Sequence, residues 1–210
     1  MTGTGVSRQS RPRTRVRCAT VAFLAVTCVS TAVPATAAGP WRAQVVDADT
    51  DQPLPDVVVV GAWTLRTPGP VHEGASFHAA DEVVSDGTGR FVLPAQRGSS
   101  RIPFTRLSGP QIWMLKGGYG GWRFRLPPRI DANDAVVRDR LVKEAWLRFE
   151  TDGVTIELLP ARSREERLQA LRRNEIFVSV PPCHVPRWLS AFNAERRALG
   201  LTPFPTVAPC

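Results

Sequence analysis

The feature that most constrains this chain is a series of short apolar runs, each ended by a turn signal. They occupy residues 42–49, 56–63, 77–86, 90–94, 111–116 and 121–126. The run 56–63 (DVVVVGAW) is rich in β-branched residues and has the length of a buried strand. Short strands that recur about every 8–12 residues between turns are typical of a sandwich. We therefore predict a mainly β fold for this stretch, with its strands in an antiparallel β-sandwich.

The chain changes character after the proline pair at 127–128. Residues 131–150 place apolar side chains at both helical and strand spacings, so their pattern assigns no element. Residues 152–160 (DGVTIELLP) predict one more strand. We divide the exported part of the chain into a sandwich domain, 39–128, and a mixed, mostly helical C-terminal extension, 129–210, packed on it.

Two helices are predicted in this extension. Ser163 and Glu166 have the spacing of a capping box, in which each side chain accepts a backbone N–H of the other residue. A second helix is expected from about Pro186 to Leu199. Proline suits its first position, and Gly200 suits the left-handed residue that follows a helix.

The first 38 residues have the pattern of a cleavable secretory signal peptide. Residues 1–17 hold five arginines and no acidic residue, residues 18–33 are apolar and uncharged, and small residues lead up to Ala38. The apolar run is shorter than the roughly 20 residues that span a membrane, and Pro34 ends it. We therefore predict a periplasmic or secreted protein without a membrane span after cleavage. A lipoprotein anchored through Cys28 is the alternative.

Removal of this segment changes the arguments from charge and cysteine content. Without residues 1–38 the chain keeps 22 basic and 19 acidic residues, a net charge of +3. That small excess gives weak support for a nucleic-acid-binding face, and we expect no nucleic-acid partner. Two cysteines remain, Cys183 and Cys210. An even pair in an exported chain predicts a disulfide between them.

Two segments resemble the carboxypeptidase regulatory-like domain, also called transthyretin-like or prealbumin-like. The first, VVDADTDQPLPDVVVVGAW, has a strand that ends in aspartate, a turn of the T-x-x-P-L type and an apolar strand. The second, SDGTGRFVLP, has the family's D-x-x-G-x-F-x-L hairpin. The matching positions are Val45, Val46, Asp47, Thr50, Pro53, Leu54, Val57 to Val60, Asp86, Gly89, Phe91 and Leu93. Asp56 departs from the pattern, because the family usually has glycine there.

The resemblance covers roughly residues 41–126 and implies a seven-stranded antiparallel sandwich with a non-enzymatic role. Asp86 is expected to accept hydrogen bonds from its turn, and Gly89 to take a positive φ. In zinc carboxypeptidases such a domain is appended to a catalytic one. Nothing in this sequence resembles that catalytic domain, so peptidase activity does not carry over.

Residues that could carry chemistry are few. His72 and His78 are six positions apart in a segment without helical period, unlike the paired histidines of a zinc peptidase. The alternate aspartates of residues 47–51 resemble a calcium loop but lack the glycine and glutamate that an EF-hand requires. A metal site that combines Glu73 with the two histidines, and a weak cation site at 47–51, are the alternatives. We predict no catalytic residue, no metal and no cofactor.

The hairpin at 116–122 (KGGYGGW) is the candidate contact surface. It looks like the lysine-glycine-tyrosine hairpin of bacterial envelope proteins that carry this domain, and its four glycines leave little bulk beside Tyr119 and Trp122. Exposed aromatics on a rigid hairpin are common binding anchors, and Lys116 adds one positive charge. Inward packing of Trp122 against the sandwich is the alternative.

The function predicted from these patterns is a non-catalytic, exported binding or interaction module of the cell envelope. Its partner is expected to be a protein or a glycan. The rival prediction is a hydrolase or accessory enzyme with its site between the sandwich and the C-terminal extension.

Overall fold

A computed structural model describes residues 1–2, 37–69, 72–97, 104–127, 135–208 and 210. Residues 34–210 form a compact unit distinct from residues 1–33. The predicted signal peptide, 1–38, and its alternative lipidation residue, Cys28, lie outside the described residues, apart from 1–2 and 37–38.

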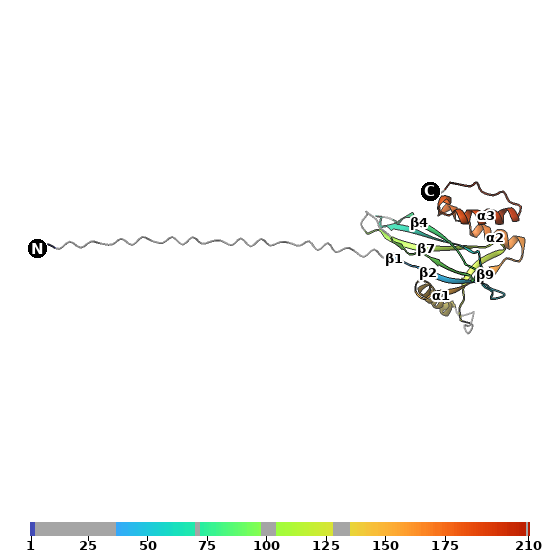
Figure 1. The fold of residues 1–210 in the computed structure, drawn as a ribbon, viewed down its shortest axis with the longest axis horizontal. Helices are drawn as coiled ribbons and strands as arrows, with labels where there is room; N and C mark the ends of the chain where they lie inside the picture. The colour runs from blue at the N-terminus through green and yellow to red at the C-terminus, as the bar shows by residue number, and fades with distance from the viewer. Residues whose placement is uncertain (3–36, 70–71, 98–103, 128–134, 209) are drawn as a thin grey trace. The chain divides into compact units, whose positions relative to one another are not determined.

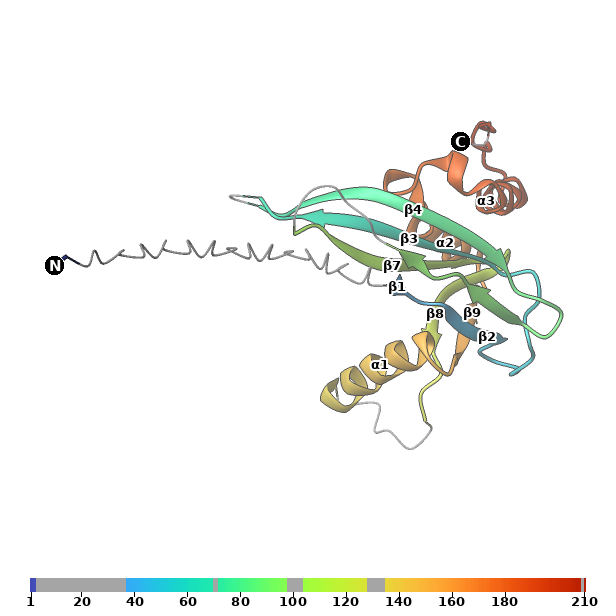
Figure 2. The same ribbon diagram turned by 60° about the vertical axis from the view of Figure 1, so that its left-hand side comes forward.

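Two sheets build most of the unit, and a third is a short pair (Figures 1 and 2). The four-stranded sheet has the order β5 (Arg90–Leu93), β2 (Trp41–Asp47), β9 (Val154–Pro160) and β8 (Tyr119–Phe124). The three-stranded sheet has the order β4 (Gly74–Val84), β3 (Val58–Thr67) and β7 (Arg106–Leu115). The pair consists of β1 (Ala37–Ala38) and β6 (Gln96–Arg97).

The helices lie on two sides of these sheets. They are α1 (Ala135–Glu150), α2 (Arg164–Arg173), α3 (Pro186–Ala198) and the short 3-10 helices η1 (Ile176–Val178) and η2 (Pro182–His184). Figures 1 and 2 show α3 beside the three-stranded sheet and α1 on the opposite side, next to β2. None of the described helices combines the length and apolar character that a membrane crossing requires.

The predicted mainly β fold with two sheets and a helical C-terminal part is confirmed. Two details differ from the expected seven-stranded antiparallel sandwich: the described residues contain nine strands, and β2 pairs with β9 in parallel. A parallel pair needs a long connection. Here six strands, β3 to β8, and the helix α1 lie between β2 and β9 in the sequence. Because β9 lies between β2 and β8, the four-stranded sheet draws strands from both sides of residue 128.

The run of four valines serves two hydrophobic cores. Val57 and Val59 belong to the cluster between the sheets, with Trp41 and Trp63. Val58 and Val60 face the other way and pack with residues of the C-terminal helices, including Trp188 and Phe192. Successive side chains of a strand point to opposite faces, so a strand covered on both faces needs a continuous apolar run.

Local signals in the sequence explain several turns and caps. Asp86 Oδ1 accepts the backbone N–H groups of Thr88 (2.8 Å) and Arg90 (2.9 Å), and Gly89 has a φ of 74°. Both features were expected. Asp56, which replaces the family's glycine, adopts a φ of 58°, a left-handed conformation that aspartate tolerates better than most residues.

The C-terminal part is held together by a cap and a disulfide that were predicted. The Ser163 and Glu166 capping box is present at the start of α2. Cys183 and Cys210 form a disulfide with their Cα atoms 5.1 Å apart. The α3 helix, which begins at the expected Pro186, has no side-chain cap from its own N-cap residue, Val185.

Candidate functional site

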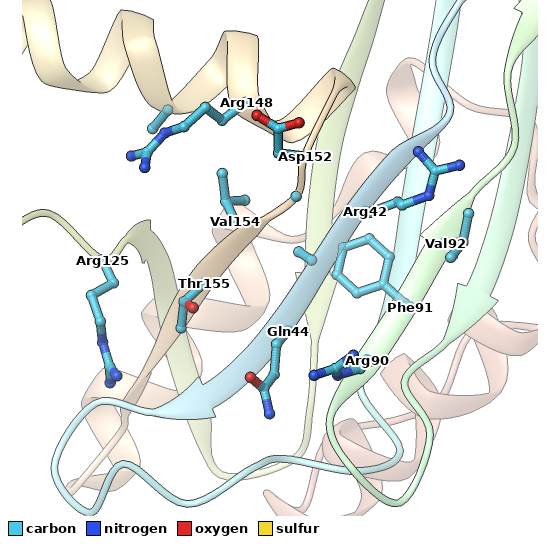
Figure 3. A pocket seen from close by; sticks show the side chains of 13 residues that line it. Arg42, Gln44, Arg90, Phe91, Val92, Arg125, Arg148, Asp152, Val154 and Thr155 are labelled. Carbon is cyan, nitrogen blue, oxygen red and sulfur yellow. The ribbon is translucent and has the colours of Figure 1, made fainter.

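An open groove of about 510 Å³ lies where the end of α1 approaches β2, β5 and β9 (Figure 3). Its volume falls in the range of small-ligand sites, roughly 300–1,000 Å³. Four arginines line it: Arg42 on β2, Arg90 on β5, Arg125 just after β8 and Arg148 in the last turn of α1. Asp152 is the single carboxylate among the described residues of the lining.

Four of the lining side chains form one row across the sheet. Gln44 of β2 is the register partner of Arg90 on β5 and of Thr155 on β9. The backbone N–H of Arg125 donates to the carbonyl oxygen of Thr155 at 2.9 Å, which continues the row. Neighbouring strands are about 4.8 Å apart, so the row extends roughly 14 Å from Arg90 to Arg125. Figure 3 shows these four side chains side by side.

Strand alternation places the row on the polar face. On β2, Trp41, Ala43 and Val45 are buried, whereas Arg42 is exposed and Gln44 is half-buried. The same alternation on β5 buries Phe91 and Leu93 and exposes Arg90 and Val92. The apolar residues of each strand thus fill the core and leave the arginines on the opposite face.

Three of the four arginines form no ion pair among the residues that the structure describes. Arg90 does lie near the Asp86 carboxylate, whose pKa is lowered by hydrogen bonds from Thr88 and from the Arg90 backbone and by the charge of Arg90. Within the described ranges, no ion pair or side-chain hydrogen bond involves the guanidinium of Arg42, Arg90 or Arg148. The Gln44 amide nitrogen donates to the Thr88 carbonyl at 3.0 Å, which leaves its Oε1 as an acceptor. The groove therefore presents cationic donors and at least one acceptor.

Arg125 is the exception. Its Nε donates to Glu157 Oε1 at 2.9 Å, and its terminal nitrogen also contacts Asp51. The hydrogen bond to Glu157 and the two nearby negative charges raise the pKa of Arg125 above its ordinary value. The charge of Arg125 is balanced by Glu157 and Asp51. The unpaired positive charge of the groove therefore lies on the other three arginines.

The residues of the predicted contact hairpin are bound to other parts of the chain. Lys116 Nζ donates to the Pro55 carbonyl oxygen at 2.7 Å. The Tyr119 hydroxyl donates to Asp47 Oδ2 at 2.8 Å, and burial together with this carboxylate raises the pKa of Tyr119 to about 12. Whether the hairpin also contacts a partner stays a prediction.

Trp122 packs inward against the sandwich, which was the alternative to an exposed binding position. Its ring meets Phe124 and Trp146 edge-on, with centroids 5.4 and 6.2 Å away. It is half-buried against the cluster between the sheets.

Glu195, an acidic residue of α3, packs against the hairpin at Gly117. Glu195, which is only 7% exposed, lies beside Gly117: a Cβ on that glycine would be 3.0 Å from Glu195 Oε2. Arg167 of α2 donates Nε and a terminal nitrogen to the two oxygens of Glu195, at 2.7 and 2.8 Å. The absence of a side chain at Gly117 thus permits close approach by a residue of the chain itself. We call the hairpin residues 116–119 with Asp47, Arg167 and Glu195 the junction.

The acidic residues of the two candidate metal sites, at 47–51 and at Glu73, pair with arginines of the same chain. Asp49 pairs with Arg162 at 2.7 Å, and Asp51 contacts Arg125. Glu73 pairs with Arg66 and Arg106, each at 2.9 Å. Among the residues that the structure describes, one group brings three possible metal ligands together, namely Cys183, His184 and Cys210. Its two sulfurs are joined in the disulfide.

The groove was missed in the sequence, although a signal for it was present. The strand segments RAQVVD, RFVL and WRFR each carry arginine at a position alternating with apolar residues, which predicts a basic outer face. Their relative order in the sheet was the missing information. No family model matches this chain, and no curated protein or solved structure shows significant similarity to it.

Proposed function

We propose that this chain is an exported, non-catalytic binding module of the cell envelope, periplasmic or secreted, and that its ligand lies in the arginine-lined groove. The observation that supports this is a groove of ligand size in which Arg42, Arg90 and Arg148 form no ion pair with any described residue. Paired arginines stabilise a fold, whereas unpaired ones on one surface are available to a ligand. The lining holds one carboxylate and neither histidine, serine nor cysteine, which favours binding over catalysis.

The proposal includes a relation to the carboxypeptidase regulatory-like domain. Two facing sheets of four and three strands, together with the Asp86 turn and the positive φ of Gly89, support it. The parallel pairing of β2 and β9 is a departure that the C-terminal extension introduces.

The rival function, a hydrolase or accessory enzyme, has one observation in its favour. The groove lies between strands of the predicted sandwich domain and residues of the extension, including Arg148 and Asp152, where such a site was expected. Asp152 would be the candidate acid or base, and its carboxylate is exposed.

The test compares three forms of the exported, processed protein immobilised on beads. They are the parent, the groove variant R42Q/R90Q/R148Q and the hairpin variant Y119A/W122A, each checked for folding by circular dichroism. Fractionated envelope glycans and proteins are passed over the beads, and bound material is identified by mass spectrometry. We expect the parent and the hairpin variant to retain the same unaltered ligand and the groove variant to lose it.

Two results would contradict the proposal. Recovery of the ligand in cleaved form, with cleavage abolished by Asp152→Asn, would establish the enzymatic rival. Loss of the ligand in a folded hairpin variant alone would move the contact surface to residues 116–122.

A further inference from the structure

We infer that the ligand of the groove is an acidic polysaccharide, held through its oxyanion groups by Arg42, Arg90 and Arg148. This inference rests on the proposed binding function and adds the chemical class of the ligand. It follows from the charge of the groove, from its lack of apolar anchor points and from the hydrogen-bonding groups in the row that crosses the sheet.

The charge of the groove selects an anion. A guanidinium presents planar, paired donors that match carboxylate, sulfate and phosphate oxygens. Arg123 of the same sheet is an arginine whose charge is paired, because its Nε donates to Glu157 Oε2 at 2.7 Å. Arg42, Arg90 and Arg148 form no such ion pair within the described part of the chain. Asp152 is the one carboxylate of the described lining, and Asp86, outside the lining, lies near Arg90.

The apolar lining argues against a protein partner. Protein interfaces depend on aromatic or aliphatic side chains that insert into apolar pockets. Three apolar lining residues are covered by the protein, because Ala43, Phe91 and Ala145 are 7%, 4% and 1% exposed. The other two apolar lining residues are Val92, which is 53% exposed, and Val154, which is half-buried. The groove thus lacks an apolar depression in which a partner side chain could be anchored.

The row across the sheet suits a ligand rich in hydroxyl groups. The Gln44 Oε1 acceptor and the Thr155 hydroxyl lie between Arg90 and Arg125, along roughly 14 Å of polar surface. Hydroxyl groups of a sugar chain can donate to the amide oxygen and exchange hydrogen bonds with the threonine. The groove is open, so a polymer can lie along the row that crosses the four strands.

The absence of an exposed aromatic ring further narrows the class of glycan. Neutral sugars are commonly held by stacking on an aromatic face, but Phe91, the aromatic of the described lining, is buried. Affinity must therefore come from charge, and exposed charge pairs are screened over about 8 Å at physiological ionic strength. We expect binding to weaken steeply as salt is added.

The test uses defined polymers with the exported, processed protein. Polygalacturonate carries carboxylates, dextran sulfate carries sulfates, dextran is neutral and poly-L-glutamate is an acidic peptide. Binding is measured by isothermal titration calorimetry at about 20 and 150 mM salt, with the parent, R42Q/R90Q/R148Q and the control R172Q/R173Q/R197Q. The control removes the same three charges from exposed arginines of α2 and α3.

We expect the parent to bind polygalacturonate, dextran sulfate or both, and to leave dextran unbound. The groove variant should lose about ten-fold or more in affinity for the bound polymer, and its dependence on salt should flatten. The control variant should bind as the parent does. Which acidic polymer binds then identifies carboxylate or sulfate as the recognised group.

Three results would overturn the inference. Equal, groove-dependent binding of poly-L-glutamate would assign the site to acidic peptides, and dextran binding would remove the charge argument, while both leave the binding function standing. Equal loss in the groove and control variants would show attraction to net charge alone. Shortening of the polymer by the parent would instead contradict the proposed non-catalytic function itself.

Discussion

The groove and the junction are built from the same residue types but differ in how their charges are paired. In the junction, Arg167 makes two hydrogen bonds to a carboxylate that is almost fully buried, and Tyr119 makes one to Asp47. In the groove, the guanidinium groups of Arg42 and Arg90 form no ion pair or side-chain hydrogen bond within the described ranges. The comparison shows that an arginine or a tyrosine cannot be assigned to ligand binding from the sequence alone. The structure must first show whether a carboxylate of the chain already pairs with it.

The difference follows from what covers each surface. The α2 and α3 helices bring Arg167 and Glu195 against the hairpin, so the charges there are removed from water and must pair. On the outer face of β2 and β5, Arg42 and Arg90 are exposed among the described residues, so they remain hydrated and need no partner. The predictions that follow probe this contrast, beginning with the largest expected effect on stability.

Glu195→Ala should cause the largest loss, because it removes the acceptor of both Arg167 bonds and the support beneath Gly117. Breaking a largely buried pair at one partner costs several kcal/mol. Since the Arg167 side chain is 29% exposed and can regain water, we expect about 2–3 kcal/mol. Urea unfolding followed by tryptophan fluorescence measures it.

The double variant Arg167→Ala, Glu195→Ala serves as its control. Removing both charges should restore part of the lost stability, since no unpaired charge remains. Additive losses in the two single variants would show that the pair does not act as a unit, and the contrast with the groove would disappear.

Glu82→Ala should have the next largest effect. Glu82 of β4 accepts the backbone N–H groups of Arg187 and Trp188, each at 2.9 Å, and so caps α3 from a distant strand. Loss of a helix cap costs about 0.5–2 kcal/mol. We expect a value near the upper end in urea unfolding, because two donors lose their acceptors. Glu82→Gln keeps one of the two acceptor oxygens and should therefore lose less stability than Glu82→Ala. Equal losses in the two variants would argue against capping.

Tyr119→Phe should cost about 1 kcal/mol at neutral pH, because it removes one hydrogen bond to a buried carboxylate. Burial raises the pKa of Asp47, but bonds from Tyr119 and from the backbone of Thr50 and Asp49 outweigh it and hold that pKa below 3.8. This stabilisation is present above the unfolded-state pKa and is lost as pH falls through the lower folded-state value. The difference between parent and variant should therefore shrink below about pH 4. Unfolding at a series of pH values tests this, and a constant difference would contradict the role of Asp47.

Local features of this fold were predictable because neighbouring residues determine them. The Ser163 cap, the Asp86 turn and the start of α3 each depend on residues within a few positions of one another. The partner of β9 was not predictable. Its alternation identifies a strand but does not tell which edge it joins, and the chain inserts it parallel to β2.

The candidate site was unpredictable for a similar reason. Arg90, Gln44 and Thr155 come from three distant segments and become neighbours through the register of the sheet. The hairpin was conspicuous in the sequence because its glycines are contiguous. The reason for a glycine at 117 is the close approach of Glu195 of α3, a residue 78 positions further along the chain.

The smallest expected effect on stability is that of the groove variant R42Q/R90Q/R148Q. Exposed side chains without partners contribute little to folding, and glutamine keeps much of the aliphatic stem, so each change should alter stability by no more than about 0.5 kcal/mol. Removal of three positive charges from one groove also lowers the like-charge repulsion there. Urea unfolding of this variant beside Glu195→Ala makes the contrast quantitative. A loss comparable to that of Glu195→Ala would mean that these arginines have a structural partner. The groove would then be part of the scaffold, and the binding function assigned to it would lose its support.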